Sequence, residues 1–87
     1  FGIVVLEAMA AGTPVVATDI PPCREALGGG ECGLLVPPRD PAALAGAITK
    51  LLEDESLRRR LTEAAERRVR ELYGFEKMAE RYAQLLR

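Results

Sequence analysis

The chain has 87 residues, 48% of them hydrophobic and 5% aromatic, so it can form at most one small domain with a modest core. Its 12 basic and 13 acidic residues give a formal net charge of −1, which excludes an overall field that attracts nucleic acid or an anionic membrane. With no histidine and only Cys23 and Cys32, the composition also excludes a zinc site and a thioredoxin-like redox motif.

The first predicted element is a helix over residues 3–11, IVVLEAMAA, with Gly12 as its C-terminal stop. The Val4-Val5 pair leaves a strand open as an alternative, but the alanines and the glycine favour a helix. This helix is apolar on nearly all sides. We therefore expect other elements to cover most of it.

Two short apolar runs predict buried parallel strands, at about residues 15–17 and 33–36. Between them, Pro22 to Leu27 can form a short helix, which the three glycines at 28–30 end. Pro37 and Pro38 terminate the second strand. The order helix, strand, short helix, strand predicts an α/β fold in which helices cover the faces of a parallel sheet.

The second half of the chain predicts three helices. Asp40 and Pro41 form a good N-cap and first-turn pair, and the next helix should begin near Asp54 or Ser56 and end before Gly74. Apolar residues at three- and four-residue spacing give each helix one core-facing stripe. The three stripes are Leu44, Ala47, Ile48, Leu51 and Leu52; then Leu57, Leu61, Ala64, Ala65, Val69 and Leu72; and last Phe75, Met78, Ala79, Tyr82 and Leu85.

The second of these helices carries a cluster of arginines, which could form a phosphate or nucleic-acid surface. A solvated helix face explains the cluster better, because three of the arginines follow a glutamate by four residues, the spacing of weak ion pairs. These pairs are Glu55 with Arg59, Glu63 with Arg67 and Glu66 with Arg70; the other members are Arg58, Arg60 and Arg68. No nucleic-acid partner is expected.

The start of the first helix is the strongest candidate site. Gly2 allows close backbone approach, and the free amides of the first turn can hold an anion or hydroxyl oxygens. Glu7 lies about 7 Å further along the axis at ~1.5 Å per residue, which suits a phosphate followed by a ribose diol. The alternative is a solvent-facing glutamate, which composition alone favours. Against it, Glu7 is the only charged residue between Phe1 and Asp19.

Other polar residues are weaker candidates. Asp19, Glu25 and Glu31 flank the loops after the strands, where α/β proteins tend to bind ligands, but helix capping and turn formation explain Asp19 adequately, and a catalytic role is not expected for any of the three. No pattern in the sequence singles out Arg24 or Arg39 as a residue that neutralises a phosphate. We expect no metal and no cofactor.

The cysteines and the apolar runs indicate a soluble cytoplasmic protein. Two free thiols fit a reducing compartment, and a Cys23–Cys32 disulfide is the less favoured alternative. The longest apolar run is too short to span a bilayer and no signal peptide precedes it. Because the chain starts inside an apolar element without a methionine, we expect it to be a fragment of a longer protein.

Two segments together resemble the large retaining glycosyltransferase family called the glycosyl transferases group 1, or family 4. They are FGIVVLEAMAAGTPVVATD and ECGLLVPPRDPAALAGAITKLLED, and the similarity extends over essentially the whole chain. The resemblance implies the GT-B fold of two Rossmann-like domains facing a cleft. The 87 residues would then be part of the C-terminal, donor-binding domain, with the N-terminal acceptor domain and the start of this domain absent.

In that family a motif of two glutamates separated by seven residues recognises a nucleotide-sugar donor. The resemblance implies that Glu7 is the second glutamate, which holds the ribose, and that the first lies two positions before Phe1. Backbone amides of Phe1, Gly2, Ile3 and Val4 would meet the sugar and the diphosphate. No catalytic residue is expected in this chain.

The resemblance further implies retention of configuration by front-face displacement, without a metal, and a hexosyltransferase activity of the whole protein. The chain alone is expected to be inactive, because the acceptor site belongs to the absent domain. Peripheral contact of the whole protein with a membrane is left open. Two alternatives remain: a protein-interaction module that uses the helices of residues 40–87, and a sugar-nucleotide epimerase of the same fold.

Overall fold

The computed structural model describes residues 2–73 and 83–84. Phe1 lies outside the described residues, as does most of the third predicted C-terminal helix, with its stripe Phe75, Met78, Ala79, Tyr82 and Leu85. Of that helix only Ala83 and Gln84 are described, and both are helical. The statements that follow concern the described part of the chain.

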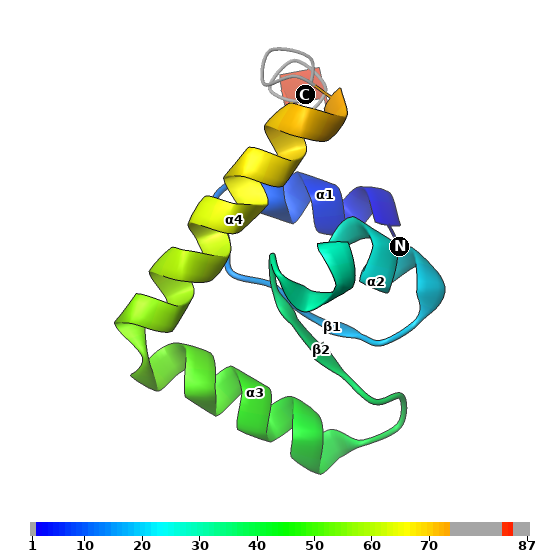
Figure 1. The fold of residues 1–87 in the computed structure, drawn as a ribbon. Helices are drawn as coiled ribbons and strands as arrows, with labels where there is room; N and C mark the ends of the chain where they lie inside the picture. Colours follow the sequence, from blue (N-terminus) through cyan, green and yellow to red (C-terminus); the bar gives the residue numbers. More distant parts are fainter. Residues whose placement is uncertain (1, 74–82, 85–87) are drawn as a thin grey trace.

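The described elements alternate helix and strand in the first half and are helical in the second (Figure 1). The predicted boundaries are correct to within one or two residues. In chain order the elements are α1 (Gly2–Ala10), β1 (Val16–Thr18), α2 (Pro21–Ala26), the 3₁₀ turn η1 (Gly28–Gly30), β2 (Leu34–Val36), α3 (Pro41–Glu53) and α4 (Glu55–Tyr73).

The two strands pair in parallel, which confirms the α/β prediction. Val16 pairs with Leu34, Ala17 with Leu35 and Thr18 with Val36. Because successive strand residues point to opposite faces, the sheet is apolar on both sides and needs a cover on each. Figure 1 shows α1 and α2 above the strands and α3 below them.

The larger hydrophobic cluster lies on the sheet face that carries Ala17 and Leu35. It joins α1, α2 and the C-terminal half of α4, and Met9 and Leu27 are almost completely buried within it. Its buried members are Val5, Leu6, Met9, Val15, Cys23, Ala26, Leu27, Cys32, Ala65 and Val69.

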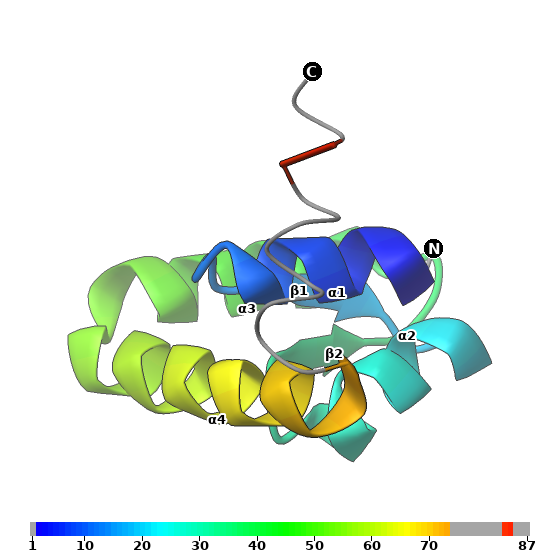
Figure 2. The same ribbon diagram turned by 90° about the horizontal axis from the view of Figure 1, so that it is seen from above.

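The smaller cluster lies on the opposite face, where Val16 and Leu34 pack against Leu51, Leu57 and Leu61. Leu51 comes from α3 and the other two leucines come from the N-terminal half of α4. Helix α4 therefore contributes to both clusters. Figure 2 shows it running beside the strands, with α2 beyond one of its ends.

The predicted stripe of α3 is wrong in its extent. Leu51 is buried, but Leu44, Ile48 and Leu52 are 43%, 44% and 74% exposed. The apolar stripe of α3 is wider than the surface that two strands and the start of α4 offer it. Leu72 was also predicted to face inward and is 47% exposed, because it lies one turn beyond Val69, where the larger cluster ends.

Side-chain caps fix the starts of α3 and α4, and the cap at Asp40 is the one that the sequence predicts. Asp40 accepts a hydrogen bond from the amide of Ala43 at 2.9 Å, and Asp54 accepts one from the amide of Leu57 at 2.9 Å. The bond from Leu57 lowers the pKa of Asp54 below its ordinary value. Carboxylates at these positions satisfy first-turn amides that have no partner within the helix.

The glycine run ends α2, as predicted. Gly28, Gly29 and Gly30 have φ angles of 60°, 73° and 107°, which residues with side chains rarely adopt. This turn returns the chain to β2. None of the helices in the described part is long and apolar enough to cross a membrane.

Candidate functional site

Helix α1 begins at the end of the sheet where ligands bind in α/β proteins. It runs antiparallel to β1 and β2, so its first turn lies at the same end of the molecule as the carboxyl ends of both strands (Figure 1). The crevice outside the carboxyl ends of parallel strands is the usual ligand position in open α/β sheets. The fold thus brings the first turn of α1 to that end.

The first turn of α1 combines free amides with limited cover. Helix geometry leaves its N–H groups without intrahelical acceptors, and they carry the positive end of the helix dipole. Ile3 and Val4 are 52% and 68% exposed, whereas Gly2 is half-buried beside Pro22 of α2. This turn can hold an anionic or hydroxyl-bearing group by its backbone.

Glu7 lies on the same side of α1 as the exposed residues of the first turn. It follows Ile3 by four residues and Val4 by three, and residues at these spacings share a helix face. The opposite side of α1 packs into the larger cluster through Val5, Leu6 and Met9. The Glu7 side chain is half-buried. A carboxylate here can accept two hydrogen bonds from a vicinal diol.

Two cavities lie near this end of the molecule. One of about 260 Å³ lies between the start of α1, helix α2 and the C-terminal half of α4, and the other, of about 200 Å³, opens where β1 and β2 end. Gly2 and Ile3 line the first cavity, together with Leu6, Pro22, Glu25, Ala26, Arg68 and Leu72. Thr18, Val36, Pro37, Arg39, Asp40, Pro41 and Leu44 line the second.

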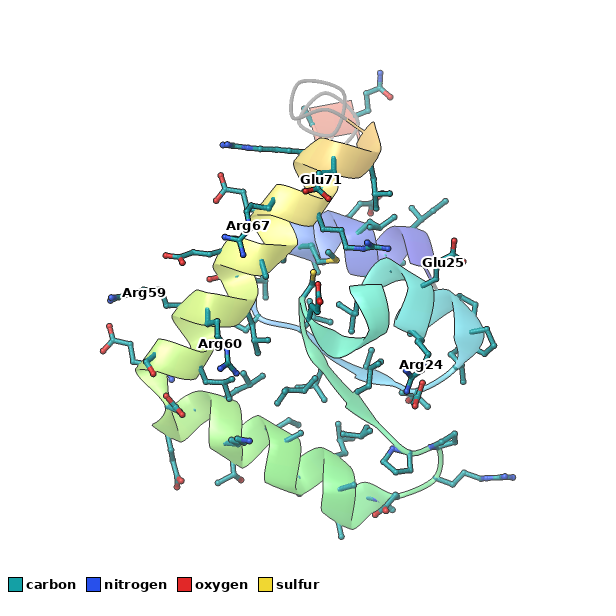
Figure 3. The ribbon with its side chains drawn as sticks, viewed as in Figure 1. Arg24, Glu25, Arg59, Arg60, Arg67 and Glu71 are labelled. Carbon is teal, nitrogen blue, oxygen red and sulfur yellow. The ribbon has the colours of Figure 1, made fainter. Side chains whose placement is uncertain are left out.

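Asp19 and Arg24 form an ion pair after β1. Arg24 Nε donates to Asp19 Oδ1 at 2.8 Å and Nη2 donates to Oδ2 at 2.6 Å, and this pairing lowers the pKa of Asp19. The prediction that Asp19 caps a helix is wrong, because Ile20 occupies the N-cap position of α2, which has no side-chain cap. Figure 3 shows Arg24 beside the end of the strands, with Glu25 higher on α2. The guanidinium of Arg24 is thus already engaged by the carboxylate of Asp19.

The remaining weak candidates gain no support. Glu25 and Glu31 are exposed, and Arg39 is exposed in a turn with a φ of 54°. The two cysteines are free, as predicted, and both are buried. Burial raises the pKa of the Cys32 thiol, which keeps it protonated and unreactive. Within residues 2–73 and 83–84, no group of three or more acidic or cysteine side chains could hold a metal ion.

The arginine cluster of α4 is only partly a solvated face. Arg59 pairs with Glu55 at 3.3 Å and Arg70 with Glu66 at 2.7 Å, as predicted, and Figure 3 shows Arg59 extending away from the molecule. The predicted pair of Glu63 with Arg67 does not form within the described part of the chain.

The prediction of a solvated face is wrong for Arg58 and Arg68. Both donate hydrogen bonds to backbone carbonyls at the ends of other helices. No sequence signal identifies the Arg68 contact, which joins residues 42 and 43 positions apart. Arg58, by contrast, lies just past the end of α3, where a basic side chain commonly binds the last carbonyls.

A parallel α/β sheet with a glycine-led helix starting at its carboxyl end defines a Rossmann-like unit, the class of fold used by GT-B enzymes. Residues 1–68 match the sequence model of the family described as "Glycosyl transferases group 1". The match covers more than half of the 87 residues, so the chain belongs to this family.

Named relatives agree with this assignment. The chain is 54% identical over 70 residues to phosphatidyl-myo-inositol mannosyltransferase of Mycobacterium leprae, a match that covers 80% of this chain and 19% of the relative. It is 42% identical over its whole length to D-inositol 3-phosphate glycosyltransferase of Corynebacterium urealyticum, 20% of which is covered.

A solved structure shares the fold. Sucrose-phosphate synthase from Thermosynechococcus elongatus superposes with a TM-score of 0.78 at 42% identity, over 99% of this chain and 22% of that one. The α/β architecture expected for a piece of a Rossmann-like GT-B domain is thus confirmed. The chain spans about a fifth of the length of these proteins.

Proposed function

We propose that this chain is the donor-binding part of a retaining glycosyltransferase that transfers a hexose from a nucleoside-diphosphate sugar. Its family membership supports transfer of a sugar. The observation that carries the choice of donor is the position of α1, whose first turn and Glu7 share one face at the carboxyl end of the parallel strands. Because the chain spans a fifth of its relatives, the acceptor site is assigned to the rest of the protein.

In this proposal each part of α1 has a separate task. The amides of Phe1, Gly2, Ile3 and Val4 hold the sugar and the diphosphate, and the Glu7 carboxylate accepts hydrogen bonds from the ribose diol. As the sugar leaves by front-face displacement, charge develops on the departing diphosphate. Helix-terminal amides aimed at that charge stabilise the transition state electrostatically, without a metal or another cofactor.

Substitution of Glu7 by glutamine in the intact protein tests the ribose role. The amide keeps the size of the side chain but accepts at one atom only, so binding of a nucleoside diphosphate should weaken by about 1.5–3 kcal/mol, or about 10- to 150-fold in Kd. Calorimetric titrations with GDP, UDP and ADP, each in turn, measure this change and identify the preferred base.

Glu53→Gln is the matched control, because Glu53 is exposed at the end of α3 on the other face of the sheet. It removes the same charge and should leave the Kd of the preferred nucleotide unchanged. Equal affinity in wild type and the Glu7 variant would contradict the ribose role.

Product analysis separates the enzymatic alternatives. Incubation of the intact protein with a nucleotide sugar gives a sugar transferred to an acceptor, with its anomeric configuration retained, if the proposal holds. An epimerase would instead return an isomerised nucleotide sugar, and an interaction module would change neither molecule. The exposed apolar residues of α3, Leu44, Ile48 and Leu52, are the observation that favours the interaction module.

We also retain a cytoplasmic location and the absence of a nucleic-acid partner as proposals. Two free, buried thiols suit a reducing compartment, and nearly balanced charge offers no general attraction for nucleic acid.

A further inference from the structure

Arg68 of α4 binds the carbonyl end of α2. Its Nε donates to the carbonyl oxygen of Ala26 at 2.9 Å and its Nη2 donates to that of Glu25 at 2.5 Å. These carbonyls lie in the last turn of α2, beyond the regular i→i−4 bonds, although the amide of the cap residue Leu27 also donates to the Glu25 oxygen. A guanidinium presents its donors in a fixed planar fork, so both bonds together fix the position of α2 against α4.

The glycine turn after α2 makes room for this contact. Gly28 has a φ of 60°, and a Cβ on it would lie 3.4 Å from both Cδ and Nη1 of Arg68. The Arg68 side chain therefore lies directly against the backbone of the turn. It is partly buried there.

The other end of α2 is close to the start of α1. Gly2 lies beside Pro22: a Cβ built on Gly2 would lie 3.6 Å from the carbonyl oxygen of Pro22 and 3.9 Å from its Cβ, so the gap between the two residues has room for about one methyl group. Helix α2 has only six residues and no side-chain cap at its N-terminus. A shift of its C-terminal end will therefore move Pro22 relative to Gly2.

We propose that Arg68 is a positioning residue for the donor site: by holding the carboxyl end of α2, it fixes Pro22 against Gly2 and so orients the first-turn amides of α1. This inference rests on the proposed function of that turn. Arg68 makes no contact with the donor in this role, and acts through α2. Displacement of preorganised groups by fractions of an ångström is enough to weaken binding.

The chain provides a matched control in Arg58, which has the same chemistry on the same helix. Arg58 Nη1 donates to the carbonyl oxygens of Leu51 and Leu52, at the end of α3, at 2.5 Å and 2.9 Å. Both arginines thus bind two successive terminal carbonyls of a neighbouring helix. Arg68 does so on α2, which shares the larger cluster with α1, and Arg58 does so on α3, which belongs to the smaller cluster on the other face of the sheet.

The test compares Arg68→Met with Arg58→Met in the intact protein. Each variant loses two hydrogen bonds of the same type, so both should lower the melting temperature by a similar amount. Only Arg68→Met should raise the Kd of the preferred nucleotide among GDP, UDP and ADP, by about tenfold, a loss typical of small misplacements in preorganised sites. Arg68→Lys restores one donor and should give an intermediate Kd.

The outcomes are distinct. An unchanged Kd in Arg68→Met, or an equal rise in Arg58→Met, would overturn the positioning role and leave only a structural one. If Arg68→Met does not fold, the same comparison is made with Arg68→Lys, for which an unchanged Kd is equally decisive. If Glu7→Gln weakens binding and neither Arg68 variant does, the inference fails alone; if the wild-type protein binds none of the three nucleotides, the proposed function fails with it.

Discussion

Gly33 lets the residues just before β1 and β2 approach each other closely. A Cβ at this residue would lie 2.8 Å from the carbonyl oxygen of Val15 and 2.9 Å from Cδ2 of Leu27. Real Cβ atoms do not approach so closely, and neither neighbour can move freely, because one is backbone and the other is completely buried. The amide of Leu34, next in the chain, bonds to the same Val15 oxygen at 2.9 Å. Glycine is therefore required here by space.

Replacing Gly33 with alanine should destabilise the fold by about 1–3 kcal/mol, the usual range for overpacking. Gly46→Ala is the control, since Gly46 is exposed in α3 with nothing within 4 Å of an added Cβ, and it should stabilise the fold by about 0.5–1 kcal/mol. Denaturant titration measures both changes. A neutral Gly33→Ala would contradict the close approach of the residues just before the strands.

At the level of elements, local sequence signals predicted the boundaries better than the packing. The proline after Asp40 and the glycine run at 28–30 act within one or two turns, so their effects can be read from the sequence. The exposure of Leu44 and Ile48 depends on the width of the sheet beneath α3, and the Arg68 contact depends on residues more than 40 positions away. Hydrophobic periodicity and secondary-structure propensity do not encode these properties.

The cap of α4 predicts a pH dependence of stability. The hydrogen bond from the amide of Leu57 lowers the pKa of Asp54 in the folded state. A carboxylate with a depressed pKa contributes its full stability above its unfolded pKa of about 4, and this contribution is lost as the pH falls through the folded value.

Asp54→Asn should keep a capping side chain but remove its titration. We expect the melting temperature of this variant to fall less than that of wild type between about pH 5 and about pH 3. Melting curves at both values test the difference. Identical losses in the two proteins would show that Asp54 does not contribute to acid sensitivity.

At the level of the whole molecule, the two faces of the sheet are unequally covered. The face with Ala17 and Leu35 lies under α1, α2 and half of α4, whereas the other face has α3 and the start of α4. The parallel sheet could be anticipated from the quoted segments, because its strands reside in short contiguous motifs, whereas the ribose role of Glu7 stays a prediction. The exposure of Leu44, Ile48 and Leu52 on α3 could not be anticipated from the sequence.

This uneven cover predicts that the 87-residue chain binds an apolar dye such as anilinonaphthalene sulfonate along α3. Ile48→Lys places a charge within the exposed part of the stripe and should reduce the dye fluorescence. Thr49→Lys adds the same charge on an exposed neighbouring residue off the stripe and serves as the control. Equal fluorescence in the two variants would contradict binding at this stripe.

Helix α4 holds the carbonyl ends of α2 and α3 through Arg68 and Arg58, and these two helices cover opposite faces of the sheet. A two-stranded sheet has little stability by itself. Local unfolding of α4 between Arg58 and Arg68 would release α2 and α3 together. The domain should consequently melt as one cooperative unit, with no intermediate in which only one layer has come apart.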